Sequence, residues 1–363
     1  MQTLKPPVIV DILIETPTIT TEAFFSIGFI VESDIAPRTF EITKLSQLLD
    51  LGFARVSMTY NVAYSVLSQK KMERVIFRSK RSEESYIEAY EADDNSSFYY
   101  ISIEDKNIDN VLEFNDHISP DTNKLQFFST TEDVSSLIGD RRLVYFYQDR
   151  FTGLDIPPYY SDGIKDYWQW DDLDITDWDN GDKLLLERQD MSVEDAQTRK
   201  SIYPETAWIG YCGWFFPSRV QWLHKHLNNV DSKKYKQIPD LATSHGITLF
   251  SSTATQGSGT TCQGVPINIQ VSLDWLVYAI SKRLWNILYR TETKINATRG
   301  GLDILEAGLL EVLNLCITEN IFSDFRIISR SVDRRTGKAS FKFSATLVHS
   351  ILGVDKVEGK IYH

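Results

Sequence analysis

Eight aspartates between Asp162 and Asp182 form the densest group of potential metal ligands in the sequence. Carboxylate oxygens are the ligands that Ca²⁺ and Mg²⁺ prefer. The run Asp177–Asp182 fails the EF-hand pattern, because a glycine at loop position six would put Thr176 and Trp178 at positions one and three. We therefore interpret the segment as a solvated acidic loop whose tryptophans pack locally, and we predict neither a metal nor a cofactor.

Other residue types with chemical potential are isolated. His224 and His226 are two apart, and no third zinc ligand is near. The small-residue run 257–261 lacks the lysine and the glycine spacing of a phosphate loop. Asp105 follows an apolar strand, where α/β enzymes place reactive groups, but Glu104–Asn107 has no glycine and indicates the start of a helix. No nucleophile, base and orienting group can be assembled, so we predict that the protein is not an enzyme.

Charge and cysteine content narrow the class of protein. A net charge of −12 argues against non-specific binding to nucleic acid or to an anionic membrane. No segment reaches the roughly 20 apolar residues that span a bilayer. Three separated cysteines indicate neither a disulfide framework nor a zinc site, and they fit a reducing cytoplasm.

One basic cluster stands out in this acidic chain. It has Phe77 as its only aromatic residue, which makes it a poor nucleic-acid patch. We interpret it as a solvated face or as a contact to an acidic neighbour. Its members are Lys70, Lys71, Arg74, Arg78, Lys80 and Arg81.

The surrounding pattern mixes strands with helices. Continuous apolar runs separated by polar helical segments predict a small parallel sheet covered by helices. The predicted strands are 98–103, 125–128 and 143–147, and the predicted helices between them are 108–118 and 133–138. Residues 60–69 are predicted to be helical and residues 74–77 extended.

The C-terminal third has the strongest order. We expect an extended stretch over 265–271, then a long helix with Asp274 in its cap or first turn. A second helix, 302–317, is apolar nearly all round and must be covered on several sides. Residues 341–348 alternate apolar and polar side chains and pair with 325–332 as a hairpin, with Gly337 supplying a positive φ.

Both ends of the chain carry further strand-like segments. Prolines bracket Val8–Ile14. Because this stretch is apolar on both faces, we expect it to be buried within a sheet. A second short strand is predicted over Val354–Tyr362. Strand-like arms therefore flank the globular body.

An ordered series of motifs runs through the second half of the chain. It comprises Tyr203-Pro204-Glu205, Ala207-Trp208, Gln221-Trp222, Gly246–Phe250 and Asp274-Trp275-Leu276. The same succession is found in the tail sheath proteins of contractile bacteriophages, and the chain resembles that family over roughly residues 200–363. The Asp- and Trp-rich segment around 162–182 departs from the family pattern.

The resemblance implies a structural function. Subunits would stack as rings in a helical sheath around a tail tube, linked by strands that each subunit lends to its neighbours, and contraction would drive the tube through the host envelope. The implied partners are other copies of the chain, the tail tube protein, and the baseplate and tail terminator proteins, in a virion tail assembled in the host cytoplasm. The alternatives are the sheath of a related contractile injection system and, in a different class, a cytosolic α/β hydrolase using Asp105 and the acidic loop.

The resemblance also implies a mixed α/β, multidomain fold. An inner domain would combine the N- and C-terminal parts, and a middle domain with a small parallel sheet would lie outside it. We place the segments at 1–18 (arm), 19–90, 91–199 (middle domain), 200–349 and 350–363 (arm). The expected inter-subunit strand residues are Val8, Val10, Ile12, Ile14, Phe341, Phe343, Ala345, Leu347, Val357 and Ile361, and the candidate tube-facing residues are Lys282, Arg283, Asp303 and Glu306.

Overall fold

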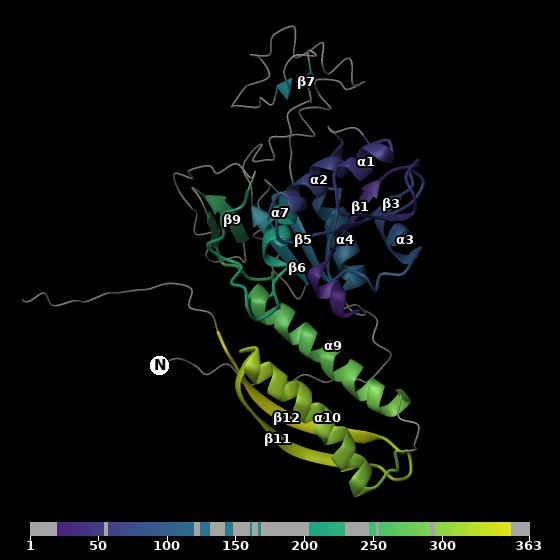
Figure 1. Ribbon diagram of the computed structural model, residues 1–363, viewed down its shortest axis with the longest axis vertical. Helices are drawn as coiled ribbons and strands as arrows, with labels where there is room; N and C mark the ends of the chain where they lie inside the picture. The colour runs from purple at the N-terminus through teal and green to yellow at the C-terminus, as the bar shows by residue number, and fades with distance from the viewer. Residues whose placement is uncertain are drawn as a thin grey trace, which may run out of the picture. The chain divides into compact units, whose positions relative to one another are not determined.

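A computed structural model describes ten ranges of the chain (Figure 1). They are 20–53, 57–119, 124–130, 142–147, 160–161, 166–167, 203–228, 247–251, 254–290 and 295–349. The predicted strands at Val8–Ile14 and Val354–Tyr362, the helix at 133–138 and most of the acidic segment lie outside these ranges. The chain divides into two compact units between Gln270 and Val271. We call them the sheet unit (described residues of 20–270) and the hairpin unit (described residues of 271–349).

The sheet unit is built on one mixed sheet of eight strands, in the order β10-β9-β6-β5-β4-β1-β3-β2. The six inner strands run parallel, and β2 and β10 add antiparallel at the two edges. The strands are β1 (Ile27–Glu32), β2 (Thr39–Ile42), β3 (Val75–Lys80), β4 (Tyr100–Ile103), β5 (Leu125–Thr130), β6 (Leu143–Tyr147), β9 (Ile247–Ser251) and β10 (Ala254–Gly257). A separate two-residue pair joins β7 (Tyr160–Ser161) to β8 (Asp166–Tyr167).

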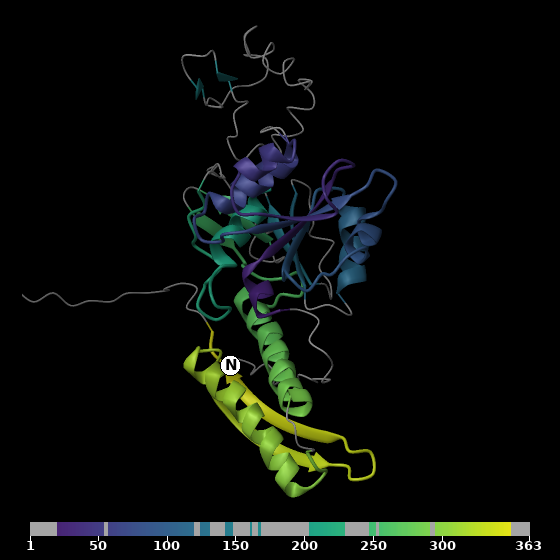
Figure 2. The same cartoon turned by 45° about the vertical axis from the view of Figure 1, so that its right-hand side comes forward.

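Helices cover both faces of this sheet (Figures 1 and 2). Helices α2 and α7 pack against each other and against the strands, while α3 packs on β1 and β3 beside α4. The helical segments of the unit are η1 (Thr21–Phe25), α1 (Ser46–Asp50), α2 (Met58–Leu67), α3 (Tyr86–Glu91), α4 (Ile108–Ile118) and α7 (Pro204–Cys212). A layered arrangement of this kind buries the apolar strands on both sides, as parallel sheets require.

The predicted parallel strands are confirmed, but the sheet is larger than expected. Strands β4, β5 and β6 pair in parallel, as their apolar runs indicated. The earlier strands β1 and β3 join the same sheet beside β4, and β9 joins it beside β6. The segments that we separated at residue 90 therefore share one sheet, because parallel pairing links strands that are distant in sequence.

Aromatic side chains fill the layer between the sheet and α7. Trp208 is fully buried and contacts Phe127, Phe146 and Trp222 edge-on, with ring centroids 5.3–5.8 Å apart. Its indole N–H donates to the Trp222 carbonyl at 2.8 Å. Such edge-to-face contacts add about 0.5–1.5 kcal/mol each beyond burial. The Trp-containing segment after α7 thus closes the core, although it forms no strand.

Lys124 is a buried cation at the start of β5. Its ammonium donates to the carbonyl oxygens of Asn95 and Phe98, and it lies 4.3 Å from the centroid of the Phe98 ring. Burial lowers the pKa of Lys124 to about 7, although the nearby Asp94 carboxylate opposes the shift. The lysine anchors the loop that precedes β4.

This lowered pKa predicts a pH-dependent stability. The unfolded chain keeps Lys124 protonated up to its ordinary pKa of 10.5, whereas the folded chain releases the proton above about pH 7. The unfolded state then binds more protons, so the free energy of unfolding should rise with pH between 7 and 9, by up to about 1.4 kcal/mol per unit. Urea unfolding of the wild type and of Lys124→Met at several pH values isolates this contribution. Parallel pH profiles for the two proteins would contradict it.

The hairpin unit consists of two helices and a long two-stranded sheet. The elements are α9 (Ile267–Arg290, whose first turn lies before the division), α10 (Arg299–Thr318), β11 (Phe322–Val332) and β12 (Ala339–Leu347). The expected extended stretch over 265–271 is wrong from Ile267 onward, because α9 begins there and Asp274 lies in its third turn rather than in its cap. Pro266 precedes the first turn, where a missing N–H costs nothing.

Candidate assembly surface

The β11–β12 hairpin keeps most of its apolar side chains on one face by means of two bulges, and Ile328 is the exposed exception. The register shifts between Phe322 and Asp324 and again between Ile327 and Ser329. Each shift leaves one extra residue on β11. Ile327 therefore faces Phe343 across the strands. A bulge also increases the local twist, and the hairpin is visibly curved beneath α10 (Figure 1). The predicted hairpin and its Gly337 turn (φ 74°) are confirmed.

The free edge of β12 presents its backbone at the residues that we predicted for strand exchange. The Val348 N–H donates to the Ile321 carbonyl, and the Lys338 carbonyl accepts from Asp333 on the other strand. Backbone groups alternate in direction along a strand. The even-numbered residues of β12 therefore bond to β11, and the odd-numbered ones direct N–H and C=O outward. These outward residues are Phe341, Phe343, Ala345 and Leu347.

Neither edge of this hairpin is covered within the described residues, where the sheet contains only β11 and β12. Most apolar side chains along both strands are half-buried, although Phe322 is buried and Ile328 is exposed, and the polar side chains between them are largely exposed. A two-stranded sheet is marginally stable alone, and an unpaired edge is a template for another strand. The hairpin unit therefore has the form of an incomplete sheet.

Arg330 fixes the hairpin to α10. Its guanidinium contacts the Asp303 carboxylate at 2.6 Å and also bonds to Glu306. These two acids were predicted as candidates for contact with a tube; the structure places both beside Arg330 on the hairpin side. Both carboxylates contact the same guanidinium nitrogen of Arg330, and hydrogen bonds between charged groups are stronger than those between neutral ones.

The other two candidate tube-facing residues lie on α9. Arg283 pairs with Glu311 of α10 at 2.5 Å, and Lys282 lies 5.4 Å from the centroid of the Tyr278 ring. The helices approach closely at Gly308, where an added Cβ would lie 2.2 Å from Cδ1 of Ile287. All four predicted residues thus belong to α9 or α10: Arg283 pairs with Glu311 within this layer, whereas Asp303 and Glu306 pair with Arg330 of β11.

In the sheet unit, Asp105 and the charged residues beside it have structural partners. Asp105 accepts hydrogen bonds from the Asn107 N–H at 2.8 Å and from the Asn110 side chain at 2.6 Å, so it holds the turn that leads into α4, whose N-cap is Asn107. A cavity of about 310 Å³ lies beside it, lined also by Glu32, Lys80 and Tyr86. Lys80 pairs with Glu32 at 2.7 Å. No nucleophile–base pair is formed among these described residues.

The remaining motifs also form no metal site where the structure describes them. No group of three metal-ligating side chains occurs in those ranges, which include His224 and His226. Gly259 has φ 60° and donates to the Thr248 hydroxyl at 3.1 Å, so its positive φ serves a turn at the sheet edge. No helix in the described part is long and apolar enough to cross a bilayer.

An ion pair between the fully buried Glu205 and the half-buried Lys106, which the sequence did not reveal, explains the Tyr-Pro-Glu motif. Glu205 is fully buried at the start of α7, and its carboxylate Oε1 lies 2.6 Å from the Lys106 ammonium nitrogen. The same ammonium donates to the Ser129 hydroxyl at 2.8 Å and lies 4.1 Å from the centroid of the Tyr203 ring. The Tyr203 hydroxyl donates to the Glu104 carbonyl at 3.0 Å. The motif therefore fastens α7 to the carboxyl ends of β4 and β5.

Burial shifts the proton equilibria of this cluster. Desolvation lowers the pKa of Lys106 and is opposed by the Glu205 carboxylate. Desolvation also raises the pKa of Tyr203 well above its usual value, with Glu104 and Glu205 adding to the effect. An ion pair 99 residues apart in the sequence leaves no local signal, so only its tertiary setting reveals it.

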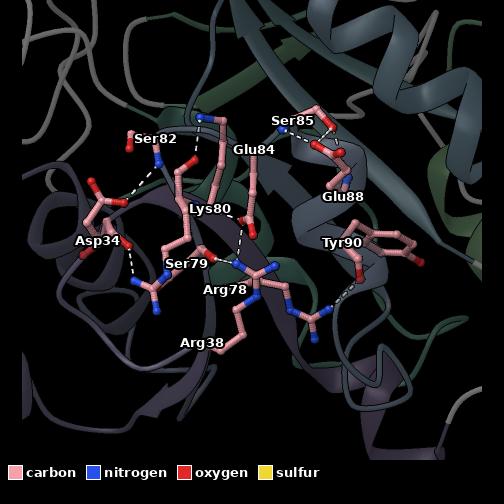
Figure 3. Close-up of polar contacts among 12 residues, drawn as sticks. Asp34, Arg38, Arg78, Ser79, Lys80, Ser82, Glu84, Ser85, Glu88 and Tyr90 are labelled. Atoms are coloured by element: carbon pink, nitrogen blue, oxygen red, sulfur yellow. Dashed lines mark hydrogen bonds and ion pairs between the residues drawn. The ribbon is translucent and has the colours of Figure 1, made fainter.

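Most of the basic cluster is used inside the sheet unit, and Figure 3 shows Arg78 and Lys80 among their neighbours. Arg78 is buried and donates to the carbonyls of Tyr90 and Asp94. Arg81 donates to the carbonyls of Ser33 and Ala36, and Arg74 contacts Ser26 and Glu41. Lys80 has its partner in Glu32, as above. Only Lys70 and Lys71 of the six remain exposed without an ion pair in the described ranges.

Comparison with known proteins identifies the fold. No family profile matches the sequence, and no curated protein matches it. The contracted helical sheath of the anti-feeding prophage aligns over 99% of this chain and 100% of that chain, with a TM-score of 0.57 and 11% identity. A chain from the contracted baseplate of that prophage aligns over 99% of both chains, with a TM-score of 0.55 and 12% identity.

A sheath tail protein from Listeria innocua is similar over 89% of this chain and 94% of that chain, with a TM-score of 0.52 and 7% identity. These alignments extend over both units and agree with the family that the motif series indicated. At such low identity, the likeness establishes the fold. The chain has the fold of contractile tail sheath proteins.

Proposed function

We propose that this chain is the structural subunit of a contractile tail sheath. Copies polymerise as stacked rings in a helical tube around a tail tube and contract to drive that tube through the host envelope. The observation that carries the proposal is the open edge of β12 in the hairpin unit, combined with the fold shared with sheath proteins. A sheath of a related contractile injection system would use the same parts.

Strand addition supplies the linkage between copies. Val8–Ile14 and Val354–Tyr362 are the two arms that copies lend, with Val8, Val10, Ile12, Ile14, Val357 and Ile361 as their pairing residues. The outward backbone groups of Phe341–Leu347 receive an arm. Each backbone hydrogen bond contributes about 0.5–1.5 kcal/mol net, so four or five give several kcal/mol per arm. Arms of this kind keep subunits connected while their bodies rotate.

The remaining partners follow from the same proposal. The α9–α10 layer, with Lys282, Arg283, Asp303 and Glu306 along it, faces the tail tube, and the ends of the sheath meet the baseplate and the tail terminator. The protein is assembled in the host cytoplasm and functions in the tail of the particle, without catalysis. The α/β hydrolase alternative is not favoured, because the Asp105 carboxylate is engaged by the Asn107 N–H and the Asn110 side chain at the start of α4.

Removal of the N-terminal arm tests the proposal. A chain lacking residues 1–16 keeps every helix and strand of the two units, so it should stay folded, and it should remain monomeric where the full chain forms tubes. Electron microscopy and sedimentation velocity of the two proteins give the comparison. Full-length protein that stays as small particles at high concentration and high salt would contradict the sheath proposal. Tubes from the truncated chain would contradict the role of the N-terminal arm alone.

A further inference from the structure

Two segments of the sheet unit meet at a surface that strand addition does not use. The turn between α2 and β3 lies against the end of α7: the Met72 N–H donates to the Gly210 carbonyl at 3.2 Å. The Asn228 backbone N–H and carbonyl bond to the Gln69 side chain at 2.9 and 2.8 Å. This bracing holds the turn, including Lys70 with its positive φ of 55°, in a fixed place.

Exposed aromatic and basic side chains gather there. Trp214 is 41% exposed, and Tyr211 and Phe215 are half-buried, with their ring centroids 6.4 Å apart. The Lys71 ammonium lies 5.8 Å from the centroid of the Phe215 ring, and Lys70 is exposed beside it. We name these five residues the aromatic–basic patch. Lys71 and Tyr211 both contact Phe215, and Lys70 and Trp214 are their exposed neighbours in sequence, so the patch combines two lysines with rings from the end of α7 and the segment after it.

The composition of the patch is that of a binding surface for an acidic partner. Tryptophan and tyrosine are enriched at the centres of protein interfaces, and an exposed group of rings is uncommon on a surface without a partner. Lys70 and Lys71 lack an ion pair among the described residues, so their positive field is not neutralised there. In a chain of net charge −12, a local positive field selects carboxylate-rich ligands.

The chain carries a segment of complementary chemistry. Residues 168–182 contain six aspartates, three tryptophans and no lysine or arginine. Aspartates suit the two lysines, and tryptophan rings suit offset or edge contacts with Trp214 and Phe215. That another copy supplies this segment rests on the proposed function, in which each chain is surrounded by further copies of itself.

We propose that the aromatic–basic patch of one copy binds residues 168–182 of a second copy. The contact joins the sheet units of neighbouring copies and is separate from the strand exchange of the hairpin unit. It also gives a function to the acidic, tryptophan-rich segment that the family pattern did not place. The lysines contribute electrostatic attraction at the rim of this contact, and Trp214 contributes apolar contact. Because salt screens the electrostatic part, the binding weakens with added salt.

A peptide of residues 168–182 tests this contact directly. Fluorescence anisotropy of the labelled peptide with the full chain should show saturable binding, weaker at high salt. The Lys70→Glu/Lys71→Glu double variant and the Trp214→Ser variant should each raise the Kd at least about tenfold. Lys44→Glu, a reversal at an exposed lysine elsewhere in the same unit, should leave the Kd unchanged. A peptide with its six aspartates changed to asparagine should not bind.

A second form of the full chain, tested with the same peptide, shows which copy supplies the segment. The full chain with the same six aspartates changed to asparagine should bind the peptide with the wild-type Kd. Clearly tighter binding to this receptor would mean that the segment occupies the patch of its own chain, which overturns the contact between copies. Absence of binding to both receptors, equal binding by the patch variants and the wild type, or preference for a single-stranded oligonucleotide over the peptide would overturn the proposal entirely. None of these readings depends on sheath formation.

Discussion

The Ala345→Pro protein is expected to fold as the wild type does and to lose assembly. The Ala345 N–H points away from β11, so proline removes no hydrogen bond within the hairpin, and proline is tolerated on the open edge of a sheet. The free energy of unfolding should change by no more than about 1 kcal/mol. The added strand of a neighbouring copy would lose a central donor and meet the proline ring, so tubes should be absent.

Two matched variants make this result specific. Ala345→Ser keeps the N–H at nearly the same side-chain size and should assemble as the wild type does. Thr346→Pro removes an N–H that bonds to β11, so it should destabilise the hairpin itself by about 3 kcal/mol. Negative-stain microscopy, sedimentation and urea unfolding distinguish these cases. Normal tubes from Ala345→Pro would show that the β12 edge does not receive an arm.

Local patterns in the sequence were sufficient for the elements that depend on local physics. Helix α4 has the predicted bounds of 108–118, because Asn107 caps it by accepting from the N–H groups of Asp109 and Asn110. The alternation along β12 predicted the residues that line its half-buried face. The two bulges of β11 were not predicted, since an extra residue on one strand is defined only by its partner strand.

The start of α9 shows where a local pattern misleads. Ile267, Ile269 and Val271 alternate with polar residues, a period typical of a strand. The same residues also lie within one turn of each other on a helix, and Ile267 and Val271 are fully buried at a spacing of four. Pro266 favours a helix start at this position. Over five residues the two periods cannot be separated, and tertiary packing decides between them.

Pairings between distant residues escaped prediction for a different reason. The parallel neighbours β1 and β4 are separated in the sequence by the 67 residues 33–99. No local signal specifies that these two strands pair. The internal use of Arg78 and Arg81 depends in the same way on loops that the fold brings together. The candidate assembly surface could be predicted from the sequence because its residues are adjacent in one hairpin. The aromatic–basic patch could not, because it forms only where two distant segments meet in the fold.

Removal of Lys106 is expected to produce the largest loss of stability in the sheet unit. Glu205 is fully buried, and one of its carboxylate oxygens already lacks a hydrogen-bond partner among the described residues. Lys106→Met would leave that carboxylate without its cation in a medium of low dielectric. Breaking a buried ion pair in this way costs about 3–5 kcal/mol, because one charge remains desolvated and uncompensated. Urea unfolding followed by tryptophan fluorescence and circular dichroism measures the loss.

The double variant Lys106→Met/Glu205→Gln separates a charge effect from a packing effect. Neutralising both partners removes the uncompensated charge, so the double variant should recover most of the stability lost by Lys106→Met. If the pair only fills space, the two substitutions should instead add, and the double variant should be the least stable protein of the series. Recovery would establish that Glu205 is kept in the core by Lys106 and that this pair sets α7 on the sheet. Since α7 carries Trp208 and leads directly into the aromatic–basic patch, the same ion pair would then fix the position of a surface for which we propose a second copy as partner.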